Sequence, residues 1–274
     1  GSVIVPRLLT QLGCTVLPVA CDGSGHFPHT PEPLPENLRS LGDAVRRENA
    51  DLGIAVDPDA DRLVLFTEEG IPFGEEYSVT TAVHSVLSSM HDTSAAAVSV
   101  NLSTTRAVDD VAARHGARVL RSPVGEINVV KSMRSQDAVV GGEGSGGIIL
   151  PAVHAGRDAL VGIVLVLHAL ARFEGTASAF LATLPQYVIR KFKYSTAGLD
   201  TDAVLAAARE AYADERINSE DGVRVDFDEG WVHLRSSNTE PIMRVIAEAP
   251  TDAEASALAA SVAARVFGPD VQAL

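Results

Sequence analysis

Three aspartates alternate along a short polar stretch that directly follows an apolar segment. Asp57, Asp59 and Asp61 come after the run of residues 52–56, and Arg62 follows them. In open α/β sheets ligands bind at the carboxyl ends of strands, so this stretch stands where a site is expected. Three carboxylates so close together repel one another unless a cation lies between them, and oxygen ligands of this kind suit Mg²⁺.

Two other interpretations of these aspartates stay open. A solvated acidic surface turn would show the same residues. A phosphatase that uses Asp57 as its nucleophile is the rival enzyme class, although its motif does not usually carry the third aspartate and the arginine. A calcium-binding EF-hand is disfavoured, because Arg62 stands where that loop needs a glycine.

A glycine-rich stretch is the second candidate. Residues 141–147 hold five glycines around Glu143 and Ser145. Glycines let a backbone approach a ligand closely, and one carboxylate can accept hydrogen bonds from two sugar hydroxyls. A tight turn between strands would explain the glycines equally well. A dinucleotide-binding fingerprint is disfavoured, because residues 148–150 predict a second strand where that motif needs a helix.

Two arginines frame the third candidate, near the C-terminus. Arg235 precedes a polar loop and Arg244 comes just beyond it. The loop carries the hydroxyl and amide side chains Ser236, Ser237, Asn238 and Thr239. Arginine forks match phosphate oxygens in bidentate fashion, which favours a phosphate site. A solvated hairpin loop is the alternative.

The elements that must position these residues alternate between strands and helices in two successive segments. The expected strands are residues 14–19, 52–56, 63–66, 95–102, 118–120, 137–140 and 148–150, and the expected helices are 3–12, one from Pro35, 104–115, 125–134 and 157–173. In the last segment we expect strands at 188–194, 223–227, 231–234 and 243–248, a helix at 200–213 and a final helix capped by Thr251.

This alternation predicts an α/β fold. We expect two tandem doubly wound α/β/α domains with mixed, mainly parallel sheets, and a smaller C-terminal α+β domain. The boundaries drawn from the sequence are a metal-binding domain at residues 1–71, a sugar-binding domain at 72–186 and a phosphate-binding domain at 187–274.

Composition excludes some classes of partner. The net charge is −14, from 36 acidic and 22 basic residues, which argues against nonspecific binding to nucleic acid or to anionic membranes. The most apolar stretch, residues 159–171, is shorter than the ~20 residues that a membrane span needs. Cys14 and Cys21 are the only cysteines, and together they fit a reducing cytoplasm and cannot form a structural zinc site alone.

Taken in order, the three candidate loops resemble those of the α-D-phosphohexomutases. Residues 57–62 (DPDADR), 142–146 (GEGSG) and 235–241 (RSSNTEP) are similar in order and spacing to that family's metal loop, sugar loop and phosphate loop. The resemblance covers nearly the whole chain, as the family's domains two, three and four. It implies an enzyme with its active site in a central cleft.

The resemblance also implies a role for each residue. Asp57, Asp59 and Asp61 would hold Mg²⁺, and Arg62 would stabilise the phosphoryl group in transfer. Glu143 and Ser145 would bind sugar hydroxyls. The phosphate that is not transferred would be held by Arg235, Ser236, Ser237, Asn238 and Thr239, with Arg244 as a helper. The implied ligands are a hexose phosphate and a hexose bisphosphate, because in this family a phosphoserine gives its phosphate to the sugar and then regains the other one.

Two departures from the family pattern matter. The phosphoserine loop of domain one, with its Ser-His-Asn-Pro context, does not occur in the sequence, so we expect a missing N-terminal serine domain and a chain that is inactive alone. The sugar loop ends in Gly146-Gly147, where many members have Gly-His. His154 or Glu126 could supply polar contacts instead, although a structural role explains either residue as well.

The substrate is left open by the sequence. Residues 121–126 and 142–147 look most like phosphoglucosamine mutases, and phosphomannomutase/phosphoglucomutase is the alternative. A sugar-phosphate-binding remnant without catalysis is the alternative outside the enzymes.

Overall fold

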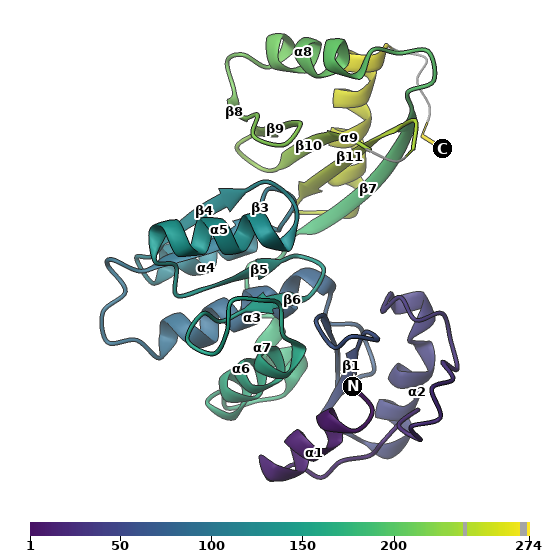
Figure 1. The fold of residues 1–274 in the computed structure, drawn as a ribbon, viewed down its shortest axis with the longest axis vertical. Coiled ribbons are helices and arrows are strands. Elements are labelled where there is room, and N and C mark those ends of the chain that lie inside the picture. Colours follow the sequence, from purple (N-terminus) through teal and green to yellow (C-terminus); the bar gives the residue numbers. More distant parts are fainter. Residues whose placement is uncertain (238–239, 269–272) are drawn as a thin grey trace. The chain divides into compact units, whose positions relative to one another are not determined.

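The computed structural model describes residues 1–237, 240–268 and 273–274. The chain divides into two compact units (Figure 1). One contains residues 1–121 and 125–185, and the other contains residues 122–124 and 186–274. The first unit contains a two-stranded and a four-stranded sheet, the second contains a five-stranded sheet, and each unit has its own buried core.

A β-hairpin carries the metal loop in the first unit. The chain begins with α1 (Ile4–Gln11), η1 (Pro35–Asn37) and α2 (Arg39–Glu48), followed by β1 (Leu52–Val56) and β2 (Leu63–Thr67). The two strands are antiparallel, with Val56 opposite Leu63. Leu38 and Val45 at α2 pack on Val64 and Phe66 of β2. The connection between these strands is therefore anchored at both ends by a packed hairpin.

The rest of the first unit is a mixed sheet with helices around it. Its elements are α3 (Glu75–Ser88), β3 (Ala97–Asn101), α4 (Ala107–Arg114), β4 (Arg118–Ser122), α5 (Glu126–Gln136), β5 (Val140–Glu143), β6 (Gly147–Ile149), α6 (Ala159–Ala171) and α7 (Ala177–Leu181). The strand order is β4-β3-β5-β6, with β3 and β5 parallel and β5 and β6 antiparallel. Both β3 and β5 are buried along their whole length, as is usual for parallel strands covered on both faces.

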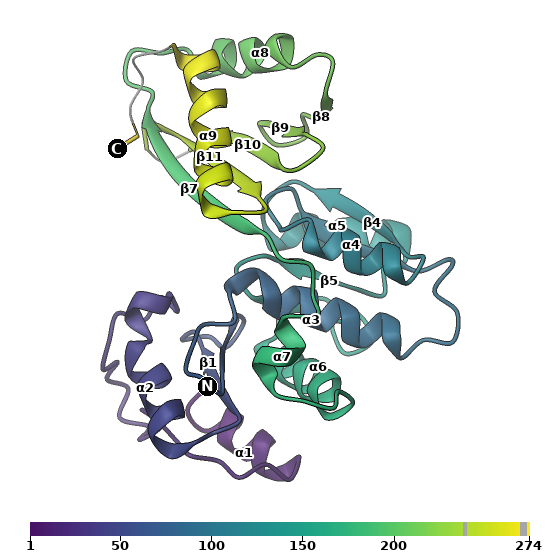
Figure 2. The same cartoon turned by 180° about the vertical axis from the view of Figure 1, so that it is seen from behind.

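The second unit has an antiparallel sheet with two helices. It contains β7 (Val188–Ser195), α8 (Thr201–Ala211), β8 (Arg216–Asn218), β9 (Val223–Asp226), β10 (Trp231–Ser236), β11 (Ile242–Ala249) and α9 (Asp252–Phe267). The order is β7-β11-β10-β9-β8. Figure 2 shows α9 in front of the central strands, and its Ala259 and Val262 share a core with Val232 and Val245.

The mixed α/β architecture with an antiparallel C-terminal sheet confirms the predicted fold class. The predicted cap is also confirmed, because the Thr251 side chain accepts a hydrogen bond from the Glu254 backbone at the start of α9. Among the described residues no helix is both long and apolar enough to cross a membrane. The most apolar one, α6, has 13 residues.

Two sequence expectations were wrong, and one helix was not predicted. Residues 14–19 form no strand, since an apolar run becomes a strand only where a neighbour completes its hydrogen bonds, and Leu17 and Val19 are exposed here. The strand expected from 137 begins at Val140, because α5 continues to Gln136 and Asp137 ends it in the left-handed conformation. Helix α3 was not predicted, because it is buried on most of its surface and shows no apolar stripe.

Candidate metal and sugar-phosphate site

Asp57 organises the loop between β1 and β2. Only 4% of the surface of this residue is exposed. Its Oδ1 accepts hydrogen bonds from the backbone N–H groups of Asp61 and Arg62 at 3.0 and 3.1 Å, and its Oδ2 accepts one from Nε of Arg62 at 2.6 Å. Ala60 turns the backbone with φ 57°. The alternating aspartates thus lie in a tight, internally bonded loop, not in a loose surface turn.

The three aspartates meet at one point of this loop. Asp57, Asp59 and Asp61 each offer an oxygen, and these atoms lie within 4.8 Å of one another. Oδ1 of Asp61 is buried without a hydrogen-bond partner, and it lies 3.8 Å from Nε of Arg62. A buried carboxylate oxygen without a partner is costly. The geometry and the oxygen donors fit a hard divalent cation, and Mg²⁺ stays the predicted ion.

The two buried aspartates have opposite pKa shifts. Burial, together with the neighbouring Asp57 carboxyl, raises the pKa of Asp61 to about 6. Burial also acts to raise the pKa of Asp57, but hydrogen bonds from the side chain and backbone of Arg62 outweigh it and hold that pKa below the usual value. The protein alone therefore stabilises one negative charge here better than two.

Arg62 is held between two acids. Nε donates to Asp57 and Nη1 donates to Oε1 of Glu32 at 2.6 Å. The Arg62 side chain is 22% exposed and that of Glu32 is 49% exposed. The fork that the resemblance assigns to a phosphoryl group thus has an exposed carboxylate as one of its partners.

The sugar loop lies directly against the metal loop. The Leu63 N–H donates to the carbonyl of Gly146 at 3.0 Å, and Arg62 and Gly147 form an antiparallel bridge. Gly146 has φ 91°, and a Cβ there would lie 2.5 Å from the Leu63 carbonyl oxygen. Only glycine permits this approach. Ser145, next to it, is partly exposed.

Glu143 is buried at the end of β5, with 6% of its surface exposed. Its Oε1 accepts hydrogen bonds from Nδ2 of Asn101 at 2.8 Å and from the Gly125 N–H at 3.0 Å. Its Oε2 accepts one from Nη1 of Arg157 at 2.9 Å. The structure thus brings Glu143 and the three aspartates into one unit, linked by Arg157, whose Nη2 donates to Oδ2 of Asp61.

Sequence reasoning missed Arg157 as a site residue. It lies just before α6, where the Asp158 side chain caps the helix by accepting from the N–H groups of Leu160 and Val161. The Ala159 N–H donates to the Ala60 carbonyl at 3.0 Å, which ties this helix start to the metal loop. A single arginine beside a helix cap carries no recognisable motif, so its partners appear only in three dimensions.

Polar residues at the ends of β3 and at the start of α3 support the sugar loop, and they too were missed. Oδ1 of Asn101 accepts from Oγ1 of Thr104 at 3.0 Å, and Oγ1 of Thr104 accepts from the Gly144 N–H at 3.1 Å. Oε2 of Glu76 accepts from the Thr105 N–H at 2.9 Å. The position of Asn101 at the carboxyl end of a buried strand was the available signal.

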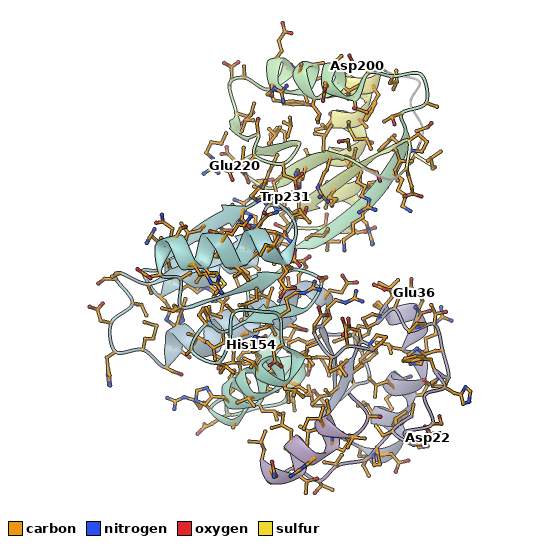
Figure 3. The ribbon with its side chains drawn as sticks, in the orientation of Figure 1. Asp22, Glu36, His154, Asp200, Glu220 and Trp231 are labelled. Carbon is orange, nitrogen blue, oxygen red and sulfur yellow. The ribbon has the colours of Figure 1, made fainter. Side chains whose placement is uncertain are left out.

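The two residues proposed to replace the family histidine are placed differently. Oε1 of Glu126 accepts from the Arg157 N–H at 2.8 Å, so it belongs to the network around Glu143. His154 lies in the loop before α6 (Figure 3), where Nε2 contacts Oδ2 of Asp158 at 3.1 Å and half of the side chain is exposed.

In the second unit, Arg235 and Arg244 face each other on neighbouring strands. They are register partners on β10 and β11, and Lys193 on β7 is the next partner along the same row. Both Arg244 and Lys193 are exposed. Nε of Arg235 donates to Oδ1 of Asp221 at 2.9 Å. Like charges opposite each other cost stability, so this row favours an anionic ligand. Lys193 was missed by sequence reasoning.

The remaining predicted phosphate-loop residues are only partly described. Ser236 ends β10, and the Ser237 N–H donates to the Ile242 carbonyl at 3.0 Å. Both serines are partly exposed. Asn238 and Thr239 lie outside the described residues, so their predicted role stays a prediction.

Comparison with known proteins identifies the family to which this α/β framework belongs. The chain matches family models described as phosphoglucomutase/phosphomannomutase α/β/α domain II at residues 1–70, α/β/α domain III at 74–187 and the C-terminal domain at 193–265. The chain belongs to the phosphoglucomutase/phosphomannomutase family.

Among its relatives is a phosphoglucomutase/phosphomannomutase of Thermococcus kodakarensis, 34% identical over 93% of this chain and 56% of the relative. A probable phosphoglucosamine mutase of Methanopyrus kandleri is 36% identical over 94% of this chain and 57% of the relative. The chain thus spans just over half the length of these curated relatives. A family protein of Burkholderia thailandensis has a solved structure with a TM-score of 0.84 and 25% identity, covering 98% of this chain and 59% of that one.

Proposed function

We propose that this chain provides the metal-binding, sugar-binding and phosphate-binding parts of a phosphohexomutase, with glucosamine phosphate as the preferred substrate. The proposal is carried by the convergence of one oxygen each from Asp57, Asp59 and Asp61, beside which Oδ1 of Asp61 is buried without a hydrogen-bond partner. The Glu143 loop bonded directly to the same hairpin adds a sugar-binding element beside it.

Each set of residues has a proposed task. Asp57, Asp59 and Asp61 would hold Mg²⁺, which when bound supplies positive charge to neutralise a phosphoryl group in transfer. Arg62 donates hydrogen bonds to the same phosphoryl oxygens once its fork turns from Glu32. Catalysis in this family rests mainly on positioning and charge neutralisation, and a phosphoserine is the group that exchanges phosphate with the sugar. No side chain among these 274 residues therefore has to act as the nucleophile.

The other two loops have separate proposed tasks, one for the sugar and one for a phosphate. Glu143 and Ser145 accept and donate hydrogen bonds to the sugar hydroxyls. The second phosphate is bound by the phosphate loop, consisting of Arg235, Ser236, Ser237, Asn238, Thr239 and Arg244. Exchange of phosphate between two positions requires that the sugar can be bound in either of two orientations.

The Asp57 oxygens accept hydrogen bonds from the loop backbone and from Arg62, and the role proposed for this carboxylate is to hold the cation, not to attack phosphate. The phosphoserine that donates and regains phosphate would come from a polypeptide segment outside these 274 residues. The hexose bisphosphate is then the intermediate that the chain must retain.

A coupled mutase assay tests this proposal. The chain alone and a longer polypeptide that adds a Ser-His-Asn-Pro loop are supplied with glucosamine 6-phosphate, Mg²⁺ and a bisphosphate activator. We expect turnover only with the longer polypeptide. Faster turnover of mannose or glucose phosphates would correct the substrate to that of a phosphomannomutase/phosphoglucomutase. A longer polypeptide that binds these sugars without any turnover would favour the non-catalytic remnant.

A further inference from the structure

One guanidinium group joins three carboxylates from three separate segments. Arg157 bonds to Asp61 in the metal loop and to Glu143 at the sugar loop. Its backbone N–H donates to Glu126 at the start of α5, and its Nε lies 3.6 Å from Oε2 of the same residue. The Arg157 side chain is 23% exposed, so these ion pairs lie largely away from solvent, where charge interactions are stronger.

The stem of Arg157 occupies the space over Gly147. A Cβ on Gly147 would lie 2.3 Å from Cδ of Arg157 and 3.1 Å from its Cγ. Gly147 opens strand β6 without a left-handed backbone angle, so the backbone itself would accept another residue. The glycine at this position therefore leaves room for the arginine, and any side chain there would have to displace it.

Arg157 bonds to one oxygen of Asp61 and to one oxygen of Glu143, so the two oxygens of each carboxylate have different partners. Oδ2 of Asp61 is taken by Arg157, which leaves the partnerless Oδ1 for a cation. Oε2 of Glu143 is taken by Arg157, whereas Oε1 is bonded to Asn101 and Gly125. Because a guanidinium group is a rigid planar fork, a rotation of either carboxylate changes the position of the group that holds the other.

We propose that Arg157 is a positioning residue that couples cation binding at Asp57, Asp59 and Asp61 to sugar-phosphate binding at Glu143. The inference rests on the proposed function. Sugar hydroxyls that bond to Glu143 fix the Arg157 fork, and the fixed fork holds Asp61 with Oδ1 toward the cation. Linkage requires the converse as well, so a bound cation strengthens sugar-phosphate binding by the same factor.

Calorimetric titration of Mg²⁺ into the full chain, with and without saturating glucosamine 6-phosphate, measures this coupling. Arg157→Lys keeps the charge but cannot hold two carboxylates with one fork. We expect it to weaken Mg²⁺ binding about tenfold, as loss of a group that orients a metal ligand does. We also expect the ratio of the two Mg²⁺ affinities, measured with and without the sugar phosphate, to fall by about fivefold or more. Any part of the coupling that comes from direct contact between Mg²⁺ and the phosphate would remain in Arg157→Lys.

Two further variants complete the test. Gly147→Ala adds a methyl group where the Arg157 stem lies and leaves every charge in place, so it should reduce the coupling in the same direction even if Arg157→Lys fails to fold. Arg118→Lys changes an exposed arginine that bonds to Gln136 in the same unit, and it should behave as the wild type.

The two proposals fail in different ways. Wild-type chain that binds neither Mg²⁺ nor glucosamine 6-phosphate would overturn the proposed function, and the coupling with it. Wild-type chain that binds both, with affinities and coupling unchanged in Arg157→Lys and in Gly147→Ala, would overturn only the role of Arg157. A merely structural arginine would lower the melting temperature in these variants without changing the ratio of the two Mg²⁺ affinities.

Discussion

Glu32 holds the guanidinium group of Arg62, with Nη1 of the arginine donating to Oε1 of the glutamate at 2.6 Å. Hydrogen bonding to Arg62 lowers the pKa of the Glu32 carboxyl, so this acid is ionised at neutral pH. An anionic ligand of Arg62 must compete with that carboxylate. Glu32 therefore acts as an internal competitor for the arginine assigned to the phosphoryl group.

Removal of the competitor should strengthen anion binding. We expect Glu32→Gln to tighten binding of glucosamine 6-phosphate by up to about fivefold, the scale of a half-exposed ion pair. Glu36→Gln is the matched control, because Glu36 is an exposed acid on the neighbouring η1 turn (Figure 3). Equal affinities in calorimetry for the wild type and Glu32→Gln would show that Glu32 does not restrain Arg62.

Asp59 gives the cleanest test of the metal loop. It is the exposed member of the three aspartates, so Asp59→Asn should leave the fold intact. We expect it to weaken Mg²⁺ binding at least about tenfold, since even residues that only orient ligands have effects of that size. Asp51→Asn, an exposed acid just before β1, should change nothing. Equal Mg²⁺ affinities for both variants would place the cation elsewhere.

Arg235, Arg244 and Lys193 form a row of cations across the sheet of the second unit. Removing one of these charges should have opposite effects on phosphate binding and on stability. Arg244→Gln removes a donor to phosphate, so we expect affinity for glucosamine 6-phosphate to fall by roughly tenfold. It also removes repulsion from Arg235 and Lys193, its register partners, so the free energy of unfolding should rise by about 0.2–1 kcal/mol.

Lys193→Gln should act in the same two directions but more weakly on affinity, because lysine lacks the bidentate fork. Lys131→Gln, on the exposed surface of α5 in the other unit, is the control for loss of a positive charge. Calorimetry and urea unfolding measure both effects. If Arg244→Gln lowers stability and leaves the affinity for glucosamine 6-phosphate unchanged, these cations have a structural role and do not bind phosphate.

His233 predicts how stability depends on pH. Burial lowers its pKa from 6.5 to about 4, and its Nε2 lies 2.6 Å from the Asp221 carbonyl oxygen, a contact that the neutral ring makes by donating its proton. Between pH 4 and 6.5 the unfolded chain binds more protons than the folded one, so stability falls as pH decreases through this window. The contribution is on the order of 3 kcal/mol.

Urea unfolding at a series of pH values measures this dependence. His233→Gln keeps a side-chain amide that can donate to the same carbonyl and removes the titrating group. We therefore expect a flatter dependence of the unfolding free energy on pH between 4 and 6.5 in the variant. Parallel curves for wild type and variant would assign the acid sensitivity to other groups.

The sequence located the candidate loops better than it located the residues that form hydrogen bonds with them. Local patterns sufficed to place Asp57 to Asp61 directly after a strand, but they left the burial of the loop open, because a solvated turn would show the same alternating carboxylates. The hydrogen bonds of Glu143 come from Asn101 and Arg157, 42 residues before it and 14 after it. Nothing local connects such residues, since sheet order and helix packing bring them together.

The same reasoning explains the misassigned elements. Residues 14–19 have the apolar composition of a strand, but a strand also needs a neighbour to bond to, which composition does not reveal. Lys193 lies in a strand that the sequence predicted. Its place beside Arg244, however, depends on β11 pairing with β7 across about fifty residues of intervening chain. In both cases the outcome depends on which strands pair, and strand pairing joins residues far apart in the sequence.

Calorimetric titration of glucosamine 6-phosphate into the chain, in excess Mg²⁺ and again in EDTA, tests the central claim most directly. The account predicts binding in Mg²⁺ that weakens in EDTA, and an Asp59→Asn variant in which Mg²⁺ at a concentration that saturates the wild type makes little difference. Wild-type chain that shows no binding in either condition, or equal binding in both, would contradict the claim that these loops form a metal-dependent hexose phosphate site.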